Sequence, residues 1–191
     1  MERYTADMKL EKLLTEKKES LSKKWFDAVL ATYPEDSSSF MGKQKNPFTN
    51  PVGHTLRRGI EGMLNELLGD FDYEKVSPFL DDIIRVRAVQ DFTPSQAVSF
   101  IFLLKGLIRE ELLKSKTEVP WAELPALESK IDGLVLLSFD IFVACREKLY
   151  EIKANELRNM TFRLLQRVNV MDEDEGEKPG SSSGNNANEK N

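Results

Sequence analysis

Residues 87–97, Arg-Ala-Val-Gln-Asp-Phe-Thr-Pro-Ser-Gln-Ala, join two apolar helix patterns and carry three helix-start signals in a row. Thr93 is suited to cap the second helix. Pro94 is favoured at the first helical position, because its fixed φ matches a helix and its missing N–H is not needed there. Gln96 stands where a side chain reaches back to the N–H of the cap residue, which completes a capping box. We therefore expect a fixed corner between a helix that ends near Asp91 and one that starts at Pro94.

Apolar side chains recur at three- and four-residue spacing in long stretches on both sides of this corner. Residues 35–50 are instead rich in Ser, Gly and Pro, which predicts a long loop. No stretch shows the strict alternation of a β-strand. The spacing predicts helices at residues 8–33, 51–68, 72–91, 94–114 and 124–170, and hence an all-α fold with a long C-terminal helix.

The last twenty residues of the chain differ in composition from the rest. The chain has 191 residues, enough for one domain with its own core. Its net charge is −5, but six acidic and two basic side chains lie in residues 172–191, so the rest is close to neutral. This last segment is acidic and then rich in Gly, Ser and Asn, with too little apolar surface to order itself. We expect a folded domain at residues 1–171 and a disordered tail at 172–191.

Composition also narrows the location and the partners. A nearly neutral domain lacks the basic surface that nucleic-acid binding requires, so we expect no nucleic-acid partner. Cys145 is the only cysteine, which excludes an intrachain disulfide and fits a reducing cytoplasm. The N-terminus has no signal peptide pattern. The longest apolar stretch, 133–145, is shorter than the roughly 20 residues that span a membrane. We expect a cytoplasmic protein that is not embedded in a membrane.

The second half of the longest predicted helix carries a heptad repeat. This spacing is typical of helices that wrap around each other in a coiled coil. The repeat covers only about three heptads and includes Ala and Thr, so it fits equally a short dimer coil and a helix that packs on its own domain. The seam consists of residues that alternate steps of four and three, namely Tyr150, Ala154, Leu157, Thr161, Leu164, Val168 and Met171.

The sequence holds none of the common catalytic or cofactor-binding motifs, such as a glycine-rich dinucleotide loop, a phosphate-binding loop or HExxH. We therefore expect no enzymatic activity and no cofactor. His54, the only histidine, is the one candidate for a haem ligand. On a helical projection it lies on the flank of the apolar stripe that contains Leu56 and Ile60, whereas a haem ligand points into an apolar pocket.

Two charged side chains fall on apolar faces. Arg87 lies on the inward face of its predicted helix, with Gln90 on the same side, and Asp140 lies inside the apolar run of the last helix. A charge on an apolar face must be paired or must reach water. We predict that Arg87 and Asp140 meet at one helix junction; the alternative is that each reaches a nearby edge. A ligand pocket is expected, if anywhere, near Phe100 and Asp140.

Three segments, in this order and spacing, carry a family resemblance. They are Asn46 to Thr55, Arg87 to Ala97, and Leu137 to Phe142 followed by Cys145-Arg146-Glu147. Together they resemble the N-terminal domain of the RsbRD type, the sensor-like domain of RsbT co-antagonists in bacterial stressosomes, over about residues 10–165. The resemblance implies a globin-like helical bundle that lacks haem, forms dimers and is normally joined through a long helix to a C-terminal STAS domain. Residues 172–191 are expected to form a disordered tail and not such a domain, so antagonism through a STAS phosphorylation site is not expected of this chain alone.

We expect a regulatory or scaffolding protein that acts through contacts with a protein partner, as a stand-alone sensor-like domain that forms homodimers. The corner formed by Arg87, Gln90, Phe92 and Thr93 is expected to fix how two helices meet, and the long helix to carry dimerisation or transmit a signal. Single-domain relatives beside redox complexes suggest one alternative, an accessory or assembly protein of an anaerobic redox complex of the sulfite-reduction type, bound peripherally to a membrane complex. Another alternative is a haem or small-molecule sensor that uses His54.

Overall fold

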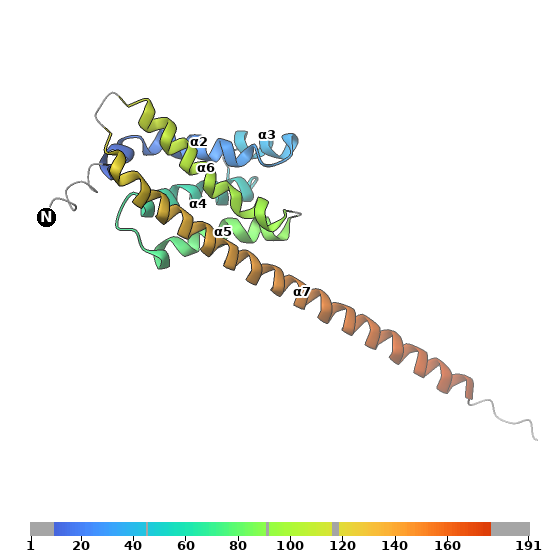
Figure 1. Cartoon of the computed structure of the whole chain (residues 1–191). Helices are drawn as coiled ribbons and strands as arrows, with labels where there is room; N and C mark the ends of the chain where they lie inside the picture. The colour runs from blue at the N-terminus through green and yellow to red at the C-terminus, as the bar shows by residue number, and fades with distance from the viewer. Residues whose placement is uncertain (1–9, 45, 91, 116–118, 177–191) are drawn as a thin grey trace, which may run out of the picture. The chain divides into compact units, whose positions relative to one another are not determined.

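The structure, a computed structural model, describes residues 10–44, 46–90, 92–115 and 119–176, with side chains described as far as residue 167. Within these ranges every regular element is a helix (Figure 1). The expected fold class, an all-α, globin-like bundle with a long C-terminal helix, is confirmed. The helices are α2 (Lys18–Leu30), α3 (Glu35–Lys43), α4 (Pro51–Leu67), α5 (Tyr73–Val89), α6 (Pro94–Leu113), the short 3₁₀ helix η1 (Trp121–Glu123) and α7 (Leu124–Gly176).

The chain divides into two units, one that ends at Lys148 and one that begins at Leu149, so that α7 starts in the first and ends in the second. In the first unit α2 packs against α3, α4 and α6, and α5 packs against α4 and α6. Gly62 allows α4 and α5 to approach each other closely, because a Cβ at this position of α4 would overlap the ring of Phe79 in α5. These contacts bury one core to which every α-helix of the unit contributes.

The first part of α7 completes this core. Leu127, Ile131 and Leu134 are buried. Two ion pairs join this part of α7 to α6, between Lys105 and Asp132 at 2.6 Å and between Arg109 and Glu128 at 2.7 Å. α6 and α7 therefore run antiparallel and side by side in the first unit.

Two predictions about the N-terminal third are wrong. The single helix expected at residues 8–33 is two helical segments, 10–16 and α2, because the backbone turns at Lys17. The long loop expected at 35–50 contains α3, which starts after Pro34 with Glu35 and Asp36 in its first turn and buries Met41. Acidic residues at a helix N-terminus are stabilising, and this signal outweighs the low helix propensity of the serines. Residues 8 and 9 lie outside the described residues.

The C-terminal end of α7 also differs from the prediction, which placed it near Val170. The helix continues to Gly176, so the first residues of the expected tail are helical. The prediction used the last apolar residue of the seam as the end, whereas each further residue of an existing helix adds a backbone hydrogen bond whether or not its side chain is apolar. The remainder of the expected tail, 177–191, lies outside the described residues. No helix in the described part of the chain is long and apolar enough to cross a membrane.

Candidate functional site

The corner between α5 and α6 is built as the sequence predicts. The hydroxyl of Thr93 accepts a hydrogen bond from the N–H of Gln96 at 3.3 Å, and the side chain of Gln96 accepts one from the N–H of Thr93 at 3.0 Å. This reciprocal pair is a capping box, with Pro94 at the first helical position. The start of α6 is therefore fixed next to the end of α5.

Arg87 is the charged side chain at this corner, and it is completely buried at 0% exposure. Its Nη1 donates to the carbonyl oxygen of Gln96 at 3.0 Å, and its Nη2 donates to the hydroxyl of Thr32 at 2.8 Å. The predicted inward orientation is confirmed. One guanidinium therefore joins the end of α5, the first turn of α6 and the residues that follow α2.

Three aromatic rings surround the same guanidinium. Its Cζ lies 4.8 Å from the ring centres of Phe92 and Phe100 and 5.2 Å from that of Tyr33. Cation–π contacts of this kind favour a positive charge in an apolar setting. Burial lowers the pKa of Arg87 and raises the pKa of Tyr33. An arginine nevertheless stays protonated in proteins, and Tyr33 with a raised pKa keeps its hydroxyl proton.

The predicted meeting of Arg87 and Asp140 is wrong. Asp140 is exposed, and within the described ranges no ion pair joins it to Arg87. Leu136, on the same face of α7, is 70% exposed. The apolar run of α7 is wider than the face that the core covers, so the sequence pattern alone does not tell which side is buried. Arg146 reaches the corner instead, where its Nη1 donates to the carbonyl oxygen of Ala88 at 3.1 Å.

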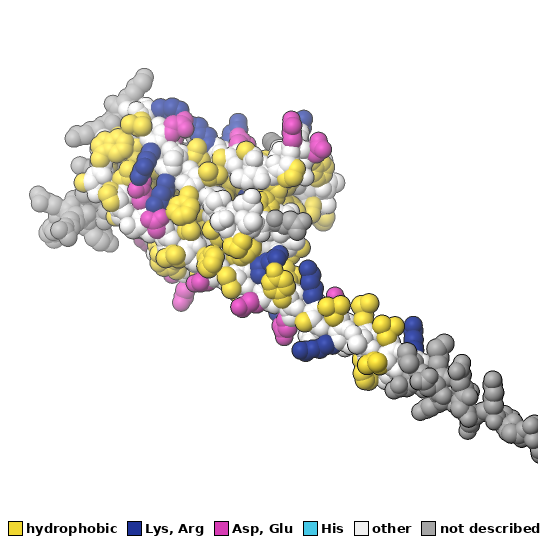
Figure 2. Space-filling model, turned by 45° about the vertical axis from the view of Figure 1, so that its right-hand side comes forward, with side chains coloured by type: hydrophobic (Ala, Val, Ile, Leu, Met, Phe, Trp, Pro, Cys, Tyr) yellow, Lys and Arg dark blue, Asp and Glu magenta, His cyan; other side chains and the backbone are white. Residues whose placement is uncertain are grey.

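The heptad seam lies in the second unit, on the surface of α7. Tyr150, Leu157 and Leu164 are 58%, 64% and 59% exposed, and Ala154 is exposed as well. Hydrophobic side chains are visible along this helix in Figure 2. The side chain of Val168 lies outside the described residues. In the described part of this unit the seam is thus a row of exposed and mostly apolar side chains.

Comparison with known proteins relates the corner between α5 and α6 and the heptad seam of α7 to a known family. The chain matches the family described as RsbT co-antagonist protein rsbRD N-terminal domain over residues 19–157, a range that holds the whole corner and the start of the seam. The chain belongs to this family. An uncharacterized protein of Archaeoglobus fulgidus is 25% identical over 136 residues, which cover 69% of this chain and 79% of that protein. No solved structure matches.

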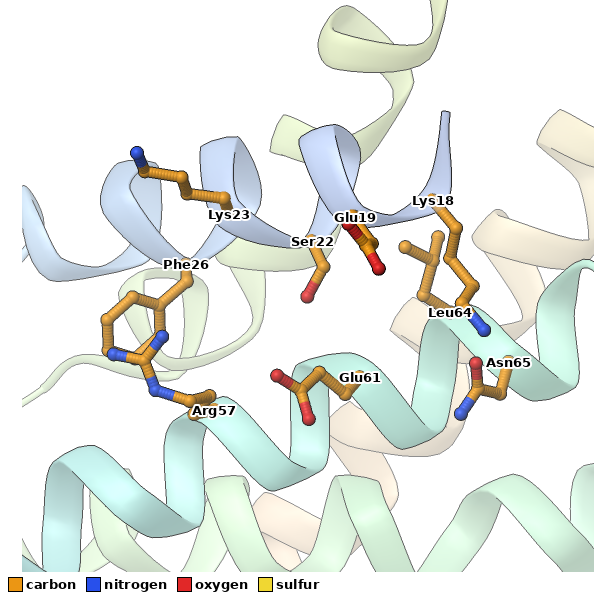
Figure 3. Close-up of a pocket in the computed structure, with 9 residues that line it drawn as sticks. All are labelled: Lys18, Glu19, Ser22, Lys23, Phe26, Arg57, Glu61, Leu64 and Asn65. Atoms are coloured by element: carbon orange, nitrogen blue, oxygen red, sulfur yellow. The ribbon is translucent and has the colours of Figure 1, made fainter. Parts of the chain in front are cut away.

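This RsbRD N-terminal domain also has a pocket that the sequence did not indicate. The pocket measures about 460 Å³ and lies between α2 and α4 (Figure 3). The guanidinium of Arg57 lies over the ring of Phe26, with its Cζ 4.1 Å from the ring centre. Most of the residues that line the pocket are polar or charged. They come from two helices that lie about forty positions apart in the sequence, so no local sequence pattern connects them. The lining consists of Lys18, Glu19, Ser22, Lys23, Phe26, Arg57, Glu61, Leu64 and Asn65.

His54 is exposed, as its place on the flank of α4 predicted. It lines a smaller pocket of about 200 Å³ together with Gln44, Gly53 and Arg57. The helix that carries it is fixed by Asn50, whose side chain accepts a hydrogen bond from the N–H of Gly53 at 2.9 Å. The surroundings of the imidazole are therefore polar. The sequence suggested a ligand pocket near Phe100 and Asp140. Phe100 is fully buried whereas Asp140 is exposed, so the two side chains lie in different environments.

Proposed function

We infer that this chain is a regulatory or scaffolding protein without enzymatic activity, which acts through protein contacts and forms homodimers through the seam of α7. Membership of the RsbRD N-terminal family supports the regulatory role. The observation that carries the dimer is the heptad spacing of three exposed side chains, Tyr150, Leu157 and Leu164. An unpacked amphipathic helix is marginally stable in water, and most helical stability comes from burying the apolar face.

The heptad positions favour a second copy in parallel as the covering helix. In the heptad notation abcdefg, Tyr150, Leu157 and Leu164 occupy position d. Met160 then occupies position g, and Leu165 occupies position e of the next heptad. In a parallel pair, g of one helix faces the following e of the other. Both side chains are exposed and apolar here, so a parallel dimer covers Met160 and Leu165 in addition to the seam.

Charged residues set the N-terminal limit of this pairing. Position a is occupied by Glu147 in the heptad that contains Tyr150 and by Asp140 in the heptad before it. A parallel dimer brings like charges at position a against each other, which is unfavourable. Pairing is therefore expected from Tyr150 onward.

Disulfide trapping tests this dimer. Leu157→Cys, in a Cys145→Ser background, is expected to form a disulfide-linked dimer on mild oxidation, because equivalent d positions face each other in a parallel pair. Asn155→Cys is the matched control, since Asn155 is exposed two positions away and points to a different side of the helix. Equal cross-linking of both variants, or none of Leu157→Cys at high protein concentration, would contradict the proposed seam.

The setting of His54 supports a haem-free protein over the haem-sensor alternative. The imidazole lies exposed in a small polar pocket, whereas a haem is held in a large apolar one. Protein produced with haem supplied is expected to show no Soret band. A Soret band that is lost in His54→Ala would establish the sensor function in its place. Affinity purification from the native cell separates a stressosome-type partner from a redox complex.

A further inference from the structure

Arg57 and Glu61 bring opposite charges to the pocket between α2 and α4 without pairing with each other. They stand four residues apart on α4, the spacing at which opposite charges pair on a helix surface. Among the described residues, no ion pair includes either side chain, although the next residue, Arg58, pairs with Asp82 of α5. Both charges are therefore available to a molecule in the pocket.

The aromatic ring of Phe26 holds the guanidinium of Arg57 in place. Phe26 is 2% exposed, and the centre of its ring lies 4.1 Å from Cζ of Arg57. A guanidinium that stacks on a ring keeps its N–H donors at its edge, where they stay open to an acceptor. The hydrogen bonds that arginines donate in the described part of the chain come from other arginines. Arg57 is thus a positioned fork of donors, which a carboxylate matches with two parallel hydrogen bonds.

Hydrogen-bond acceptors lie in the middle of the pocket, next to this fork. Figure 3 shows the carboxylate of Glu61 extending from α4 toward Ser22 of α2, with Glu19 on the same side of α2. Both carboxylates are exposed, and within the described ranges no ion pair includes Glu19. Two carboxylates and a hydroxyl match an ammonium group, which has three N–H donors and a positive charge.

We propose that this pocket binds a free α-amino acid with a neutral polar side chain, whose carboxylate binds to Arg57 and whose ammonium binds to Glu61 and Glu19. Residues four apart on a helix have Cβ atoms about 5–6 Å apart. An α-amino acid carries its ammonium on the carbon next to its carboxylate, so it is short enough to meet both side chains of α4. The pocket volume of about 460 Å³ is within the range of small-molecule sites, about 300–1,000 Å³.

The other end of the pocket determines the side chain of the ligand. There Lys18 extends from α2 toward α4, and Asn65 lines the pocket from α4, whereas Lys23 points away from it (Figure 3). A lysine ammonium and an amide bind an amide or a hydroxyl of the ligand. Lys18 and Arg57 balance the charges of the two glutamates, so a ligand without net charge preserves this balance.

Binding of the amino acid joins α2 to α4 and therefore stabilises the packing of these two helices. The regulatory domain gains an input from a small molecule. This inference goes beyond the proposed dimer and does not depend on it, because every residue of the pocket belongs to the first unit.

L-Glutamine is the probe for this site, because it is a zwitterion with an amide side chain. Added to the full chain, it is expected to raise the Tm in a saturable manner, by about 3–6 °C when its concentration exceeds the dissociation constant about tenfold. Isothermal titration calorimetry measures the dissociation constant itself. Two analogues of the same length, glutaramate without the ammonium group and γ-aminobutyramide without the carboxylate, are each expected to bind at least about tenfold more weakly.

Three variants assign the binding to the pocket. Arg57→Lys keeps the charge but loses the fork, and it is expected to raise the dissociation constant of L-glutamine at least about tenfold. Glu61→Gln changes an exposed side chain without changing its shape, so the fold is retained, and the same rise is expected. Arg58→Lys is the matched control, because Arg58 is the next residue and pairs with Asp82 outside the pocket; its dissociation constant is expected to equal that of the wild type.

Two other sets of results would overturn the proposal. If about 10 mM L-glutamine changes neither the Tm nor the heat of titration, the pocket binds no amino acid of this class. If L-glutamine binds alike to Glu61→Gln and to the wild type, or if glutaramate binds as tightly as L-glutamine, the carboxylates of the pocket do not receive an ammonium group.

Discussion

Replacement of Leu157 by alanine tests the dimer quantitatively. Full burial of a leucine side chain is worth about 1.5–3 kcal/mol. Since 64% of Leu157 is exposed, its burial in a dimer contributes roughly 1–2 kcal/mol per copy. Leu157→Ala removes most of this from both copies at once, so the dimer loses roughly 2–4 kcal/mol, which raises the dissociation constant about 30- to 900-fold. Alanine has the higher helix propensity, so a weaker helix does not explain the loss.

Sedimentation equilibrium over a range of protein concentrations measures this change directly. Ile152→Ala is the matched control, because Ile152 is 45% exposed and lies two residues from Tyr150, on nearly the opposite side of the helix. Its dissociation constant is expected to stay within about threefold of the wild type, which corresponds to less than 1 kcal/mol. If both variants weaken the dimer alike, general hydrophobicity and not the seam holds the two copies together. If the wild type is monomeric at every concentration, the reasoning fails outright.

Other predictions concern the first unit and are measured as free energies of unfolding in urea. Gly62→Ala places a methyl group against the ring of Phe79 and is expected to destabilise by about 1–2 kcal/mol, after the gain in helix propensity is subtracted. Gly106→Ala meets no atom and is expected to stabilise by up to about 1 kcal/mol; the same sign for both glycines would contradict the close approach of α4 and α5. Thr93→Ala removes the helix cap and is expected to cost about 0.5–2 kcal/mol; no change would show that the capping box does not hold the corner. The hydrogen bond with Lys114 lowers the pKa of Glu110, so Glu110→Gln is expected to destabilise at neutral pH, and its difference from the wild type to vanish as the pH falls through that lowered pKa; a difference that persists in acid would refute the assignment.

Local signals predicted the corner well because capping is local chemistry. Thr93, Pro94 and Gln96 lie within four residues, and their side chains need only their own backbone to form the box. The inward orientation of Arg87 follows in the same way from helical spacing. Neither the capping motif nor the helical spacing predicts which residues contact Arg87, because Thr32 and Tyr33 lie more than fifty residues earlier in the chain.

The prediction of which residues are buried was less accurate where a helix is apolar on several sides. In α7 the pattern places Asp140 among apolar side chains, but the core of the first unit covers only part of that surface and leaves Leu136 exposed. The α3 helix was missed for a different reason, since its serines and Gly42 have low helix propensity and only Met41 is buried. The pocket between α2 and α4 depends on how two distant helices pack, and no short sequence signal marks it.

The continuity of α7 has a consequence for how the proposed dimer would form. The slow and unfavourable step in making a helix is its first turn, with a nucleation constant on the order of 10⁻³, whereas each later residue adds one hydrogen bond. In α7 the first turns are held by the burial of Leu127 and Ile131 in the core. From Leu149 onward the chain extends an existing helix and needs no nucleus of its own. The seam is therefore presented already helical, and the proposed dimer would form with little further loss of backbone entropy.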